Sequence, residues 1–470
     1  MSDYWPRHFS AGVVREAYGP RLAGYTIALE AWRRGLRVRF LDSHLRKYEI
    51  SHGKRKIRFD KSRPSLTTSE AMKTEQNKHL TNSHLRKAGV PVPSSWVVNP
   101  AALDAEAQLL RHAESAGYPV VLKPLRGSMG KDVFTNLQGQ EDLLDTFRYV
   151  ANRTAVGGDL VLEQHFTGED YRVLVVGNRV VAACLRKPAN VTGDGQRTVQ
   201  ELIDAKNAIR LQNPYLCKKL IVHDREVDQY LQRHGYTLHD VPPSGAEVRL
   251  RGKANASQGG DSIDQTDSVP NAVKDAAARA VAAIPGLALA GVDILYDQNR
   301  LPVEDSFRVI EMNSRPEIEL NMYPWEGFGQ DVPKHFLDLF FPNSRRPKDP
   351  ANQSLALNLN QLLAPLRGAS AEEVLVKKRP NHAYPERLIY KHQHTEPFTS
   401  EEKSAIHLSA RRAGISGQCG TQDGHAYVAI CGTREQVNKF LRLSSKSLGI
   451  DRDTEQAWTR VVTQGFHFRA

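Results

Sequence analysis

Three oxygen-bearing side chains that could hold a metal ion lie at the ends of two apolar segments in the second half of the chain. Asp293 ends the segment 290–293, and Glu311 and Asn313 end the segment 309–313. Glu311 and Asn313 are two residues apart, so they share one face of an extended strand. Mg²⁺ accepts such oxygens together with water and phosphate oxygens. The pattern therefore predicts a magnesium site for a ligand that carries phosphate.

A second group of residues is suited to hold the phosphate itself. Lys123 lies at the end of the apolar segment 120–124, and Gly127, Ser128, Met129 and Gly130 follow shortly after it. Glycines let backbone N–H groups approach phosphate closely, and a lysine adds a point charge. The spacing differs from the P-loop pattern G-x-x-x-x-G-K-[ST]. An ordinary surface turn is the alternative explanation of these glycines.

A third segment has the composition of an adenine pocket. The apolar residues 160–162 lead to a polar corner with Glu163, Gln164 and Phe166. Adenine needs an apolar slot with a few placed polar groups, and Glu163 offers an acceptor to ribose hydroxyls. The end of any buried strand can look the same.

The segment 248–264 crowds cationic and small polar residues, among them Arg251 and Asn255, into one loop. Such a loop suits a clamp on a transferring phosphoryl group or on a tetrahedral oxyanion. A plain surface loop is the alternative.

Strands and helices alternate around these residues, which predicts an α/β (α+β) fold. Residues 171–181 form two apolar runs around Gly177-Asn178, a hairpin signal. Helices are expected over 69–85, 272–284, 400–413 and 434–443, and a helix followed by a strand over 21–41. The expected domains are an N-terminal α/β lead-in (1–70), a main domain (71–342), a Pro-rich and charged linker (343–380) and a small α/β unit (381–470).

Composition narrows the class of protein further. The net charge is +11, which fits a basic surface or an anionic ligand. No stacking aromatics accompany the short basic segment 54–58, which disfavours nucleic acid as a partner. The four cysteines are widely scattered, no signal-like N-terminus or apolar run of about 18 residues occurs, and we expect a cytoplasmic protein without a membrane span.

Several motifs in order give the chain a specific resemblance. They occupy residues 77–78 with 88–93, 168–175, 186–195, 259–267, and 311–313 leading to 323–327. With them the chain resembles the ATP-grasp ligases, most closely the ATP-grasp module of bifunctional glutathione synthetases and then cyanophycin synthetase. The resemblance covers about 70–342 and implies an ATP-grasp fold. It also implies a ligase that phosphorylates a carboxylate with ATP and joins the acyl phosphate to an amine.

The resemblance also implies roles for matching residues. Lys78 and Lys123 contact the ATP phosphates under the loop 127–130, and Glu163 and Phe166 frame adenine and ribose. Arg172 and Arg186 lie near the acyl phosphate and the substrate carboxylate, and Arg251 and Asn255 hold the reacting centre. Asp293, Glu311 and Asn313 bind two magnesium ions, with manganese as the alternative metal. The implied partners are amino-acid or small peptide substrates, and a homo-oligomer remains open.

Three departures from the family pattern matter. Lys131-Asp132 follows the glycine loop where another glycine is more usual, and Asn313 is not followed by the usual Pro-Gly. Arg315 and Glu317 in that place either contact a charged substrate or pair with each other. The glutamate–cysteine ligase half of a bifunctional enzyme is absent from the sequence.

Residues 410–424 resemble an acylphosphatase weakly and lack its catalytic arginine and asparagine, so we expect a non-catalytic accessory domain.

Two other functions stay open at this point. One is a ligase that adds amino acids to the C-terminus of a protein, which would need a broad open groove. The other is a nucleotide-binding scaffold without turnover, to which the departure at Asp132 gives some support.

Overall fold

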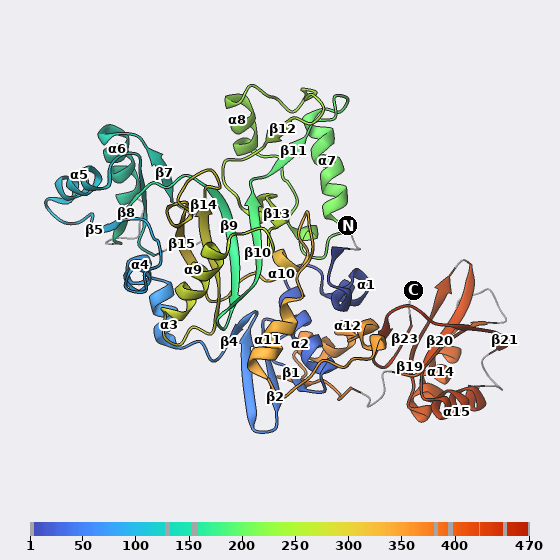
Figure 1. Cartoon of the computed structure of the whole chain (residues 1–470). Coiled ribbons are helices and arrows are strands. Elements are labelled where there is room, and N and C mark those ends of the chain that lie inside the picture. The colour runs from blue at the N-terminus through green and yellow to red at the C-terminus, as the bar shows by residue number, and fades with distance from the viewer. Residues whose placement is uncertain are drawn as a thin grey trace. The chain divides into compact units, whose positions relative to one another are not determined.

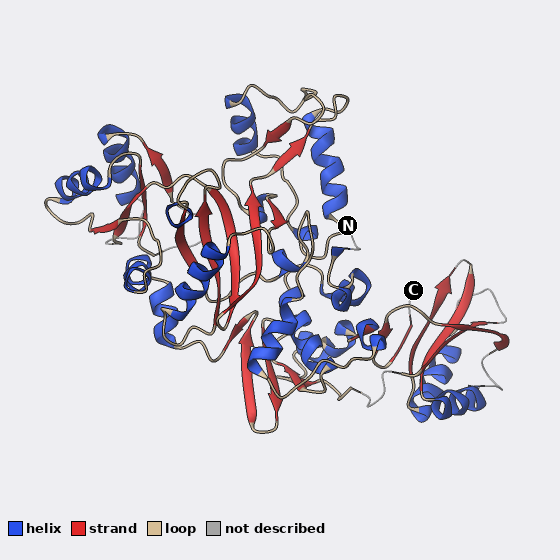
Figure 2. Cartoon of the chain, in the orientation of Figure 1, coloured by secondary structure: helices blue, strands red, loops and turns tan. Residues whose placement is uncertain are grey.

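The computed structural model describes residues 4–126, 132–152, 158–379, 384–392, 398–422, 424–444 and 449–468. Sheets and helices are both present, which confirms the mixed α/β class (Figure 2). The chain forms two compact units, one mainly of residues 57–339 and one of residues 6–56 and 340–470. No helix among the described residues has the length and apolar character needed to cross a membrane.

A five-stranded antiparallel sheet is the centre of the first unit (Figure 1). Its strands, in spatial order, are β13 (Asp261–Asp264), β10 (Arg179–Lys187), β9 (Glu169–Val176), β14 (Leu289–Tyr296) and β15 (Phe307–Asn313). β9 and β10 form the predicted hairpin, with Gly177 at a positive φ of 64°. Helix α9 (Asn271–Ala282) covers one face of this sheet.

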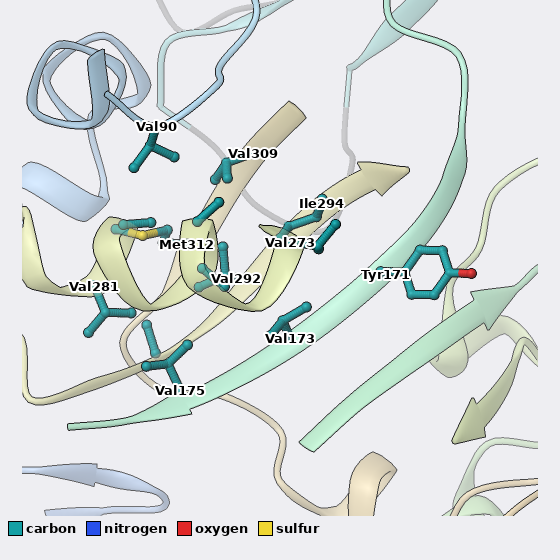
Figure 3. Close-up of a cluster of buried hydrophobic side chains, with 14 of the residues drawn as sticks. Val90, Tyr171, Val173, Val175, Val273, Val281, Val292, Ile294, Val309 and Met312 are labelled. Atoms are coloured by element: carbon teal, nitrogen blue, oxygen red, sulfur yellow. The ribbon is translucent and has the colours of Figure 1, made fainter. Parts of the chain in front are cut away.

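The two faces of the central sheet differ because successive side chains of a strand point to opposite sides. Val173, Val292 and Met312 are buried under α9, where they contact Val273 and its apolar neighbours (Figure 3). The intervening residues of the same strands therefore lie on the opposite face. Those residues include Arg172, Asp293, Glu311 and Asn313, which the sequence marks as functional.

A second sheet in this unit has the same construction. Its order is β5 (Ser95–Val98), β8 (Leu160–Gln164), β6 (Val120–Pro124) and β7 (Phe134–Leu137), and α5 (Ala105–Ala116) and α6 (Gln140–Ala151) supply its helical layer. Leu122 and Leu162 are buried against Leu109 and Phe147 of these helices. Lys123 and Glu163 follow them by one residue, so they lie on the other face.

The helix predicted over 69–85 is wrong in its continuity, because the structure has two helices there. α3 (Ser69–Glu75) ends before Asn77, and α4 (Lys78–Lys87) begins after it. The Asn77 side chain accepts hydrogen bonds from the backbone N–H groups of His79 and Leu80, each at 3.1 Å. An asparagine that caps a new helix in this way takes extended backbone angles and interrupts the previous helix.

The rest of the first unit consists of shorter elements. They are β3 (Arg55–Asp60), which begins at the unit boundary, β4 (Arg63–Pro64), β11 (Asn190–Thr192), α7 (Val199–Arg210), η4 (Leu216–Lys218), α8 (Arg225–Arg233), β12 (Glu247–Arg249), η5 (Ala256–Gln258), η6 (Val303–Asp305), α10 (Glu319–Met322) and α11 (Val332–Phe340). β11 and β12 pair as a small antiparallel ribbon that packs with α7 and α8 around its own core.

The second unit joins a short N-terminal part to the C-terminal part of the chain. The N-terminal part has η2 (Arg7–Phe9), α1 (Ala11–Val14), η3 (Arg15–Ala17), α2 (Leu22–Arg33), β1 (Arg37–Phe40) and β2 (Lys47–His52). The connecting part has η7 (Pro350–Ser354), β16 (Leu355–Ala356), α12 (Leu359–Leu362), α13 (Ala364–Arg367) and β17 (Val374–Leu375). β1 pairs with both β2 and β17.

The C-terminal part of this unit has a recognisable topology. Its elements are β18 (Glu386–His392), α14 (Ser400–Ala413), β19 (Ser416–Gln422), β20 (His425–Gly432), α15 (Arg434–Ser444), β21 (Ile450–Ala457), β22 (Val462–Thr463) and β23 (Phe466–Phe468). The sheet order is β21-β18-β20-β19-β23. From β18 to β21 this is the β-α-β-β-α-β pattern of ferredoxin-like units.

Candidate active site

A row of polar side chains crosses the open face of the central sheet. Arg172 of β9 is the register partner of Asp293 of β14, and Asp293 is the register partner of Glu311 of β15. Directly opposite residues of neighbouring strands point to the same side of a sheet. The structure therefore brings three predicted site residues together in one row, and Asn313 follows on the same side two residues after Glu311.

Asp293 is the centre of an ion-pair network. Arg172 donates to both carboxylate oxygens of Asp293, and Arg186 lies 3.0 Å from one of them. Arg186 also pairs with Asp170 at 2.5 Å. Burial by itself would raise the pKa of Asp293, but the two arginines hold that pKa below its ordinary value. The carboxylate is therefore ionised, and the two guanidinium groups are held in fixed positions.

Two lysines from other elements face this row. Lys78, the first residue of α4, has a pKa lowered mainly by burial, which the Glu311 carboxylate opposes. Burial likewise raises the pKa of Glu311, with Asp293 as the next cause, while Lys78 and Lys123 act in the opposite direction. These mutual effects put both ammonium groups within electrostatic range of Glu311. The site thus combines elements of both sheets.

Lys123 and Glu163 form a buried ion pair beneath this site. Their side chains are 2.6 Å apart and only 5% and 4% exposed. They occupy diagonal positions on β6 and β8, because Val121 is the register partner of Glu163 and Val161 that of Lys123. Glu163 thus orients Lys123. This contact differs from the role in ribose binding that was expected for Glu163.

Asp293, Glu311 and Asn313 carry oxygen ligands of the kind that a divalent cation takes. Across the described residues, no side-chain hydrogen bond occupies Glu311 or Asn313. Nowhere in the described parts of the chain are three His, Cys, Asp or Glu side chains grouped for a metal. Glu311 and Asn313 therefore offer open oxygens to Mg²⁺, which takes further ligands from water and substrate phosphate, whereas both oxygens of Asp293 already accept from Arg172.

The remaining cofactor residues expected from the sequence have mixed placements. Gly127, Ser128, Met129 and Gly130 lie outside the described residues. Phe166 is half-buried, and the guanidinium groups of Arg300 and Arg308 lie 5.3 and 5.0 Å from its ring centre. Gln164, at the end of β8, is exposed.

Arg251 and Asn255 have local partners in the segment that the sequence marked as a clamp. Arg251 is buried and pairs with Asp224 at 2.5 Å and with Glu226. The Asn255 side chain accepts hydrogen bonds from the N–H and the hydroxyl of Ser257. Among the residues that the structure describes, neither side chain contacts the Arg172–Asp293 pair.

A buried triad that sequence reasoning missed supports one of the motifs. Asp261 of β13 accepts from Lys206 at 2.6 Å and from Arg210 at 2.7 Å, both on α7. The Trp325 ring lies 4.8 Å from the Lys206 ammonium group. The spacing of the two cations, four residues apart on one helix, was the available signal. The triad ties the motif 259–267 to α7 and has a structural role.

Glu317, which the sequence marked together with Arg315, has partners that sequence reasoning missed. Glu317 accepts from the Tyr215 hydroxyl at 2.7 Å and pairs with Lys219 at 3.2 Å. Arg315 pairs instead with Asp60 at 2.8 Å. The alternative in which Arg315 and Glu317 pair with each other is therefore wrong. Burial would raise the pKa of Glu317, but Lys219 and Tyr215 lower it, and Arg172 contributes to the same effect.

Glu319 gives this region a pH-dependent stability. Burial raises the pKa of Glu319 from 4.5 to about 7, with Glu317 as the second cause. The folded chain then keeps a proton that the unfolded chain loses, so the free energy of unfolding should fall by up to about 3 kcal/mol as pH rises from 4.5 to 7. Urea unfolding at pH 5 and pH 8 should show a smaller difference for Glu319→Gln than for the native chain. The exposed Glu326→Gln is the control, and an unchanged pH dependence in Glu319→Gln would contradict the assignment.

Gly291 leaves room for Arg172 on the open face. A Cβ at Gly291 would lie 2.9 Å from Cδ of Arg172 and 3.2 Å from Cβ of Pro316. Gly291→Ala should therefore displace Arg172, lower activity about tenfold or more, and cost only about 1–2 kcal/mol of stability. Steady-state kinetics and urea unfolding measure the two effects. Gly368→Ala, whose Cβ would meet only ordinary contact at 3.5 Å, should change neither, and full activity in Gly291→Ala would refute a working role for this Arg172 position.

Comparison with known proteins places these residues in a family context. Residues 75–213 match the family model described as a RimK-like ATP-grasp domain. The chain is 33% identical to a cyanophycin synthetase of Nostoc sp. over 359 residues, which are 74% of this chain and 37% of that protein. It is 32% identical to the glutathione biosynthesis bifunctional protein GshAB of Enterococcus faecalis over 322 residues, 67% of this chain and 41% of that protein.

A solved structure agrees with these relatives. The bifunctional glutathione synthetase from Pasteurella multocida superposes with a TM-score of 0.52 at 26% identity, over 67% of this chain and 43% of that one. The resemblance inferred from the sequence motifs is thereby confirmed. The chain spans about two fifths of the length of the curated relatives named here.

Proposed function

Residues 75–213 form a RimK-like ATP-grasp domain, and on this premise we propose that the chain is an ATP-dependent carbon–nitrogen ligase. One observation carries the proposal. The row Arg172–Asp293–Glu311 faces Lys78 and Lys123, so oxygen ligands for a metal and cations for phosphate converge on one place. Such a combination is what phosphoryl transfer needs, because its catalysis is mainly positioning and charge stabilisation.

The reaction begins at a substrate carboxylate that cannot react directly with an amine. ATP supplies a γ-phosphoryl group, which turns the carboxylate into an acyl phosphate with phosphate as the leaving group. We assign Lys78 and Lys123 to the nucleotide phosphates, and Asp293, Glu311 and Asn313 to the magnesium that accompanies them. Attack by the amine then forms the C–N bond, breaks the bond between the acyl carbon and the phosphate oxygen, and releases the amine proton.

Arg172 and Arg186 have the positions to stabilise charge during these steps. Asp293 and Asp170 fix their guanidinium groups before any substrate binds. Donors that are already oriented stabilise a developing negative charge without reorganisation at the moment of reaction. We therefore assign the two arginines to the acyl phosphate and the tetrahedral intermediate that follows it.

The substrates are proposed from the relatives and from the charges next to the site. Cyanophycin synthetase and glutathione biosynthesis protein are the names of the relatives, so we propose an amino acid or short peptide as the carboxylate donor and an amino acid as the acceptor. Glu317 lies within electrostatic range of Arg172 and offers negative charge to the ammonium group of such a substrate. Addition of amino acids to a protein C-terminus is the second form of the same chemistry.

A substrate screen tests this proposal directly. The full chain is incubated with ATP, Mg²⁺ and pooled amino acids and dipeptides, and both ADP formation and the product masses are recorded. A ligase gives amine-dependent ADP and a product that has lost one water relative to its two substrates. ATP binding without amine-dependent ADP release would replace the ligase with a nucleotide-binding scaffold.

Finer features complete the proposal. We propose two magnesium ions, with manganese as a substitute, and a cytoplasmic location, which suits four cysteines that are free and buried. The β-α-β-β-α-β order of the C-terminal part supports an acylphosphatase-like accessory domain without acylphosphatase activity. We also propose domain boundaries at residues 70, 342 and 380. Assembly of the chain into a homo-oligomer is a further part of the proposal.

A further inference from the structure

The C-terminal unit has a cavity of its own, which the proposed ligase chemistry does not use. Its volume is about 740 Å³, within the range of sites for small molecules. The lining comes from η7 and the residues before it, from Arg379, Tyr384 and Pro385, from the start of β18, and from the end of β21 with Trp458 after it. All of these residues belong to the unit that lacks the candidate active site.

Three cations and two acids line this cavity. Lys348, Arg379 and Arg387 are the cations. The acid Glu386 pairs with Arg434 at 2.8 Å, and the Asp349 carboxylate accepts from the backbone N–H of Ala351 at 2.9 Å. With three cations against two acids, the cavity wall carries an excess of one positive charge.

The Arg379 guanidinium group is only partly satisfied. Its Nη1 donates to the amide oxygen of Asn352 at 2.6 Å, a neutral acceptor. Its Nε is buried and has no hydrogen-bond partner within the described part of the chain. A buried donor without an acceptor costs free energy, so this N–H group is suited to an acceptor on a bound ligand.

Arg387 lies close by and is held by neutral groups as well. It donates to the Ser354 hydroxyl at 2.5 Å and to the Ala351 carbonyl oxygen at 2.8 Å. Burial lowers the pKa of Arg379 and of Arg387, and Asp349 opposes this effect in both. Two planar guanidinium groups at one cavity match the geometry of a carboxylate or a phosphate.

Part of the lining is apolar. Trp458, Leu388 and Pro385 contribute there, and Trp458 is held by stacking on Tyr427 with ring centres 5.8 Å apart. A rigid aromatic wall beside cationic groups is suited to a ligand with a flat or apolar body next to its anionic group.

We propose that this cavity binds a small organic anion, in which a carboxylate or phosphate contacts Arg379 and Arg387 and an apolar body lies against Trp458. The site is independent of the proposed ligase function. A carboxylate and a phosphate would be recognised by the same guanidinium groups, and the probes below distinguish between them.

Binding to the full chain tests this proposal. The probes are inorganic phosphate and phenyl phosphate for one arm, and acetate and phenylacetate for the other, measured by calorimetry and by tryptophan fluorescence. We expect at least one phenyl compound to bind about tenfold or more tightly than its partner without the ring, and Arg379→Gln to weaken that binding about tenfold or more. A preference for one arm identifies the ligand as a phosphate or a carboxylate.

Matched variants keep the outcome decisive. Arg412→Gln removes an exposed arginine of α14 in the same unit and should leave binding unchanged. Arg379→Lys keeps the charge but loses the planar guanidinium group, so it should also weaken binding. It replaces Arg379→Gln in the test if that variant proves unstable. Absence of binding by all four probes, or equal binding to the native chain and to a folded Arg379 variant, would overturn the proposal.

Discussion

Glu311→Gln is expected to lower amine-dependent phosphate release about 100-fold or more, because a metal held by Glu311 would stabilise charge in the transition state by several kcal/mol. The substitution keeps the size of the side chain and removes the charge that Mg²⁺ needs. It also removes the repulsion between Glu311 and Asp293 that, after burial, raises the pKa of Glu311. The folded protein should therefore be at least as stable as the native chain, while turnover is lost.

The control for this experiment lies in the same hairpin. Glu304 is an exposed acid of η6, between β14 and β15, and Glu304→Gln should retain full turnover. Phosphate release is measured at several Mg²⁺ concentrations, and thermal unfolding confirms that both variants are folded. Normal turnover in a folded Glu311→Gln protein would defeat the metal assignment and, with it, the main support for the ligase mechanism.

Four strands of the central sheet could be predicted from the sequence because they alternate or are continuously apolar, whereas β13 lies in the segment 248–264, where a loop was expected and the expectation was wrong. The hairpin of β9 and β10 was expected from the Gly177-Asn178 turn, and the structure has it there. Strand β21 was missed because its residues 450–457 are mostly polar and at least half-exposed, so no apolar alternation marks them. An edge strand of this kind is stabilised by its neighbour β18 and leaves little signal in its own sequence.

The individual site residues could be nominated from the sequence, but their partners could not. Arg172 and Asp293 are 121 residues apart, and their contact depends on the register between β9 and β14. No local pattern contains that register. The same limit applies to Asp261, which lies in a polar motif. In the structure it is buried and forms ion pairs with two cations of α7. Helix α7 offers these cations at a spacing that is equally common on solvated surfaces.

Substitutions in the ion pair of Lys123 and Glu163 can test protein stability and ATP binding separately. Lys123→Met leaves the Glu163 carboxylate buried and uncompensated, which should lower the free energy of unfolding by about 3–5 kcal/mol. The same substitution removes the cation proposed for the nucleotide phosphates. Native ATP affinity in Lys123→Met would contradict that role, whatever its stability.

The double variant Lys123→Met/Glu163→Met separates the two effects. Replacing both partners of a buried ion pair by apolar residues is often neutral for stability, so the double variant should recover most of the lost stability. It should not recover ATP binding, because the ammonium group is still missing. The exposed pair of Arg148 and Glu106, whose side chains are 55% and 45% exposed, is the matched control. Its double replacement by Met should leave both unfolding and ATP binding nearly unchanged, since exposed pairs contribute little to stability. Recovery of ATP binding together with stability would show that Lys123 acts through the fold and does not contact the nucleotide.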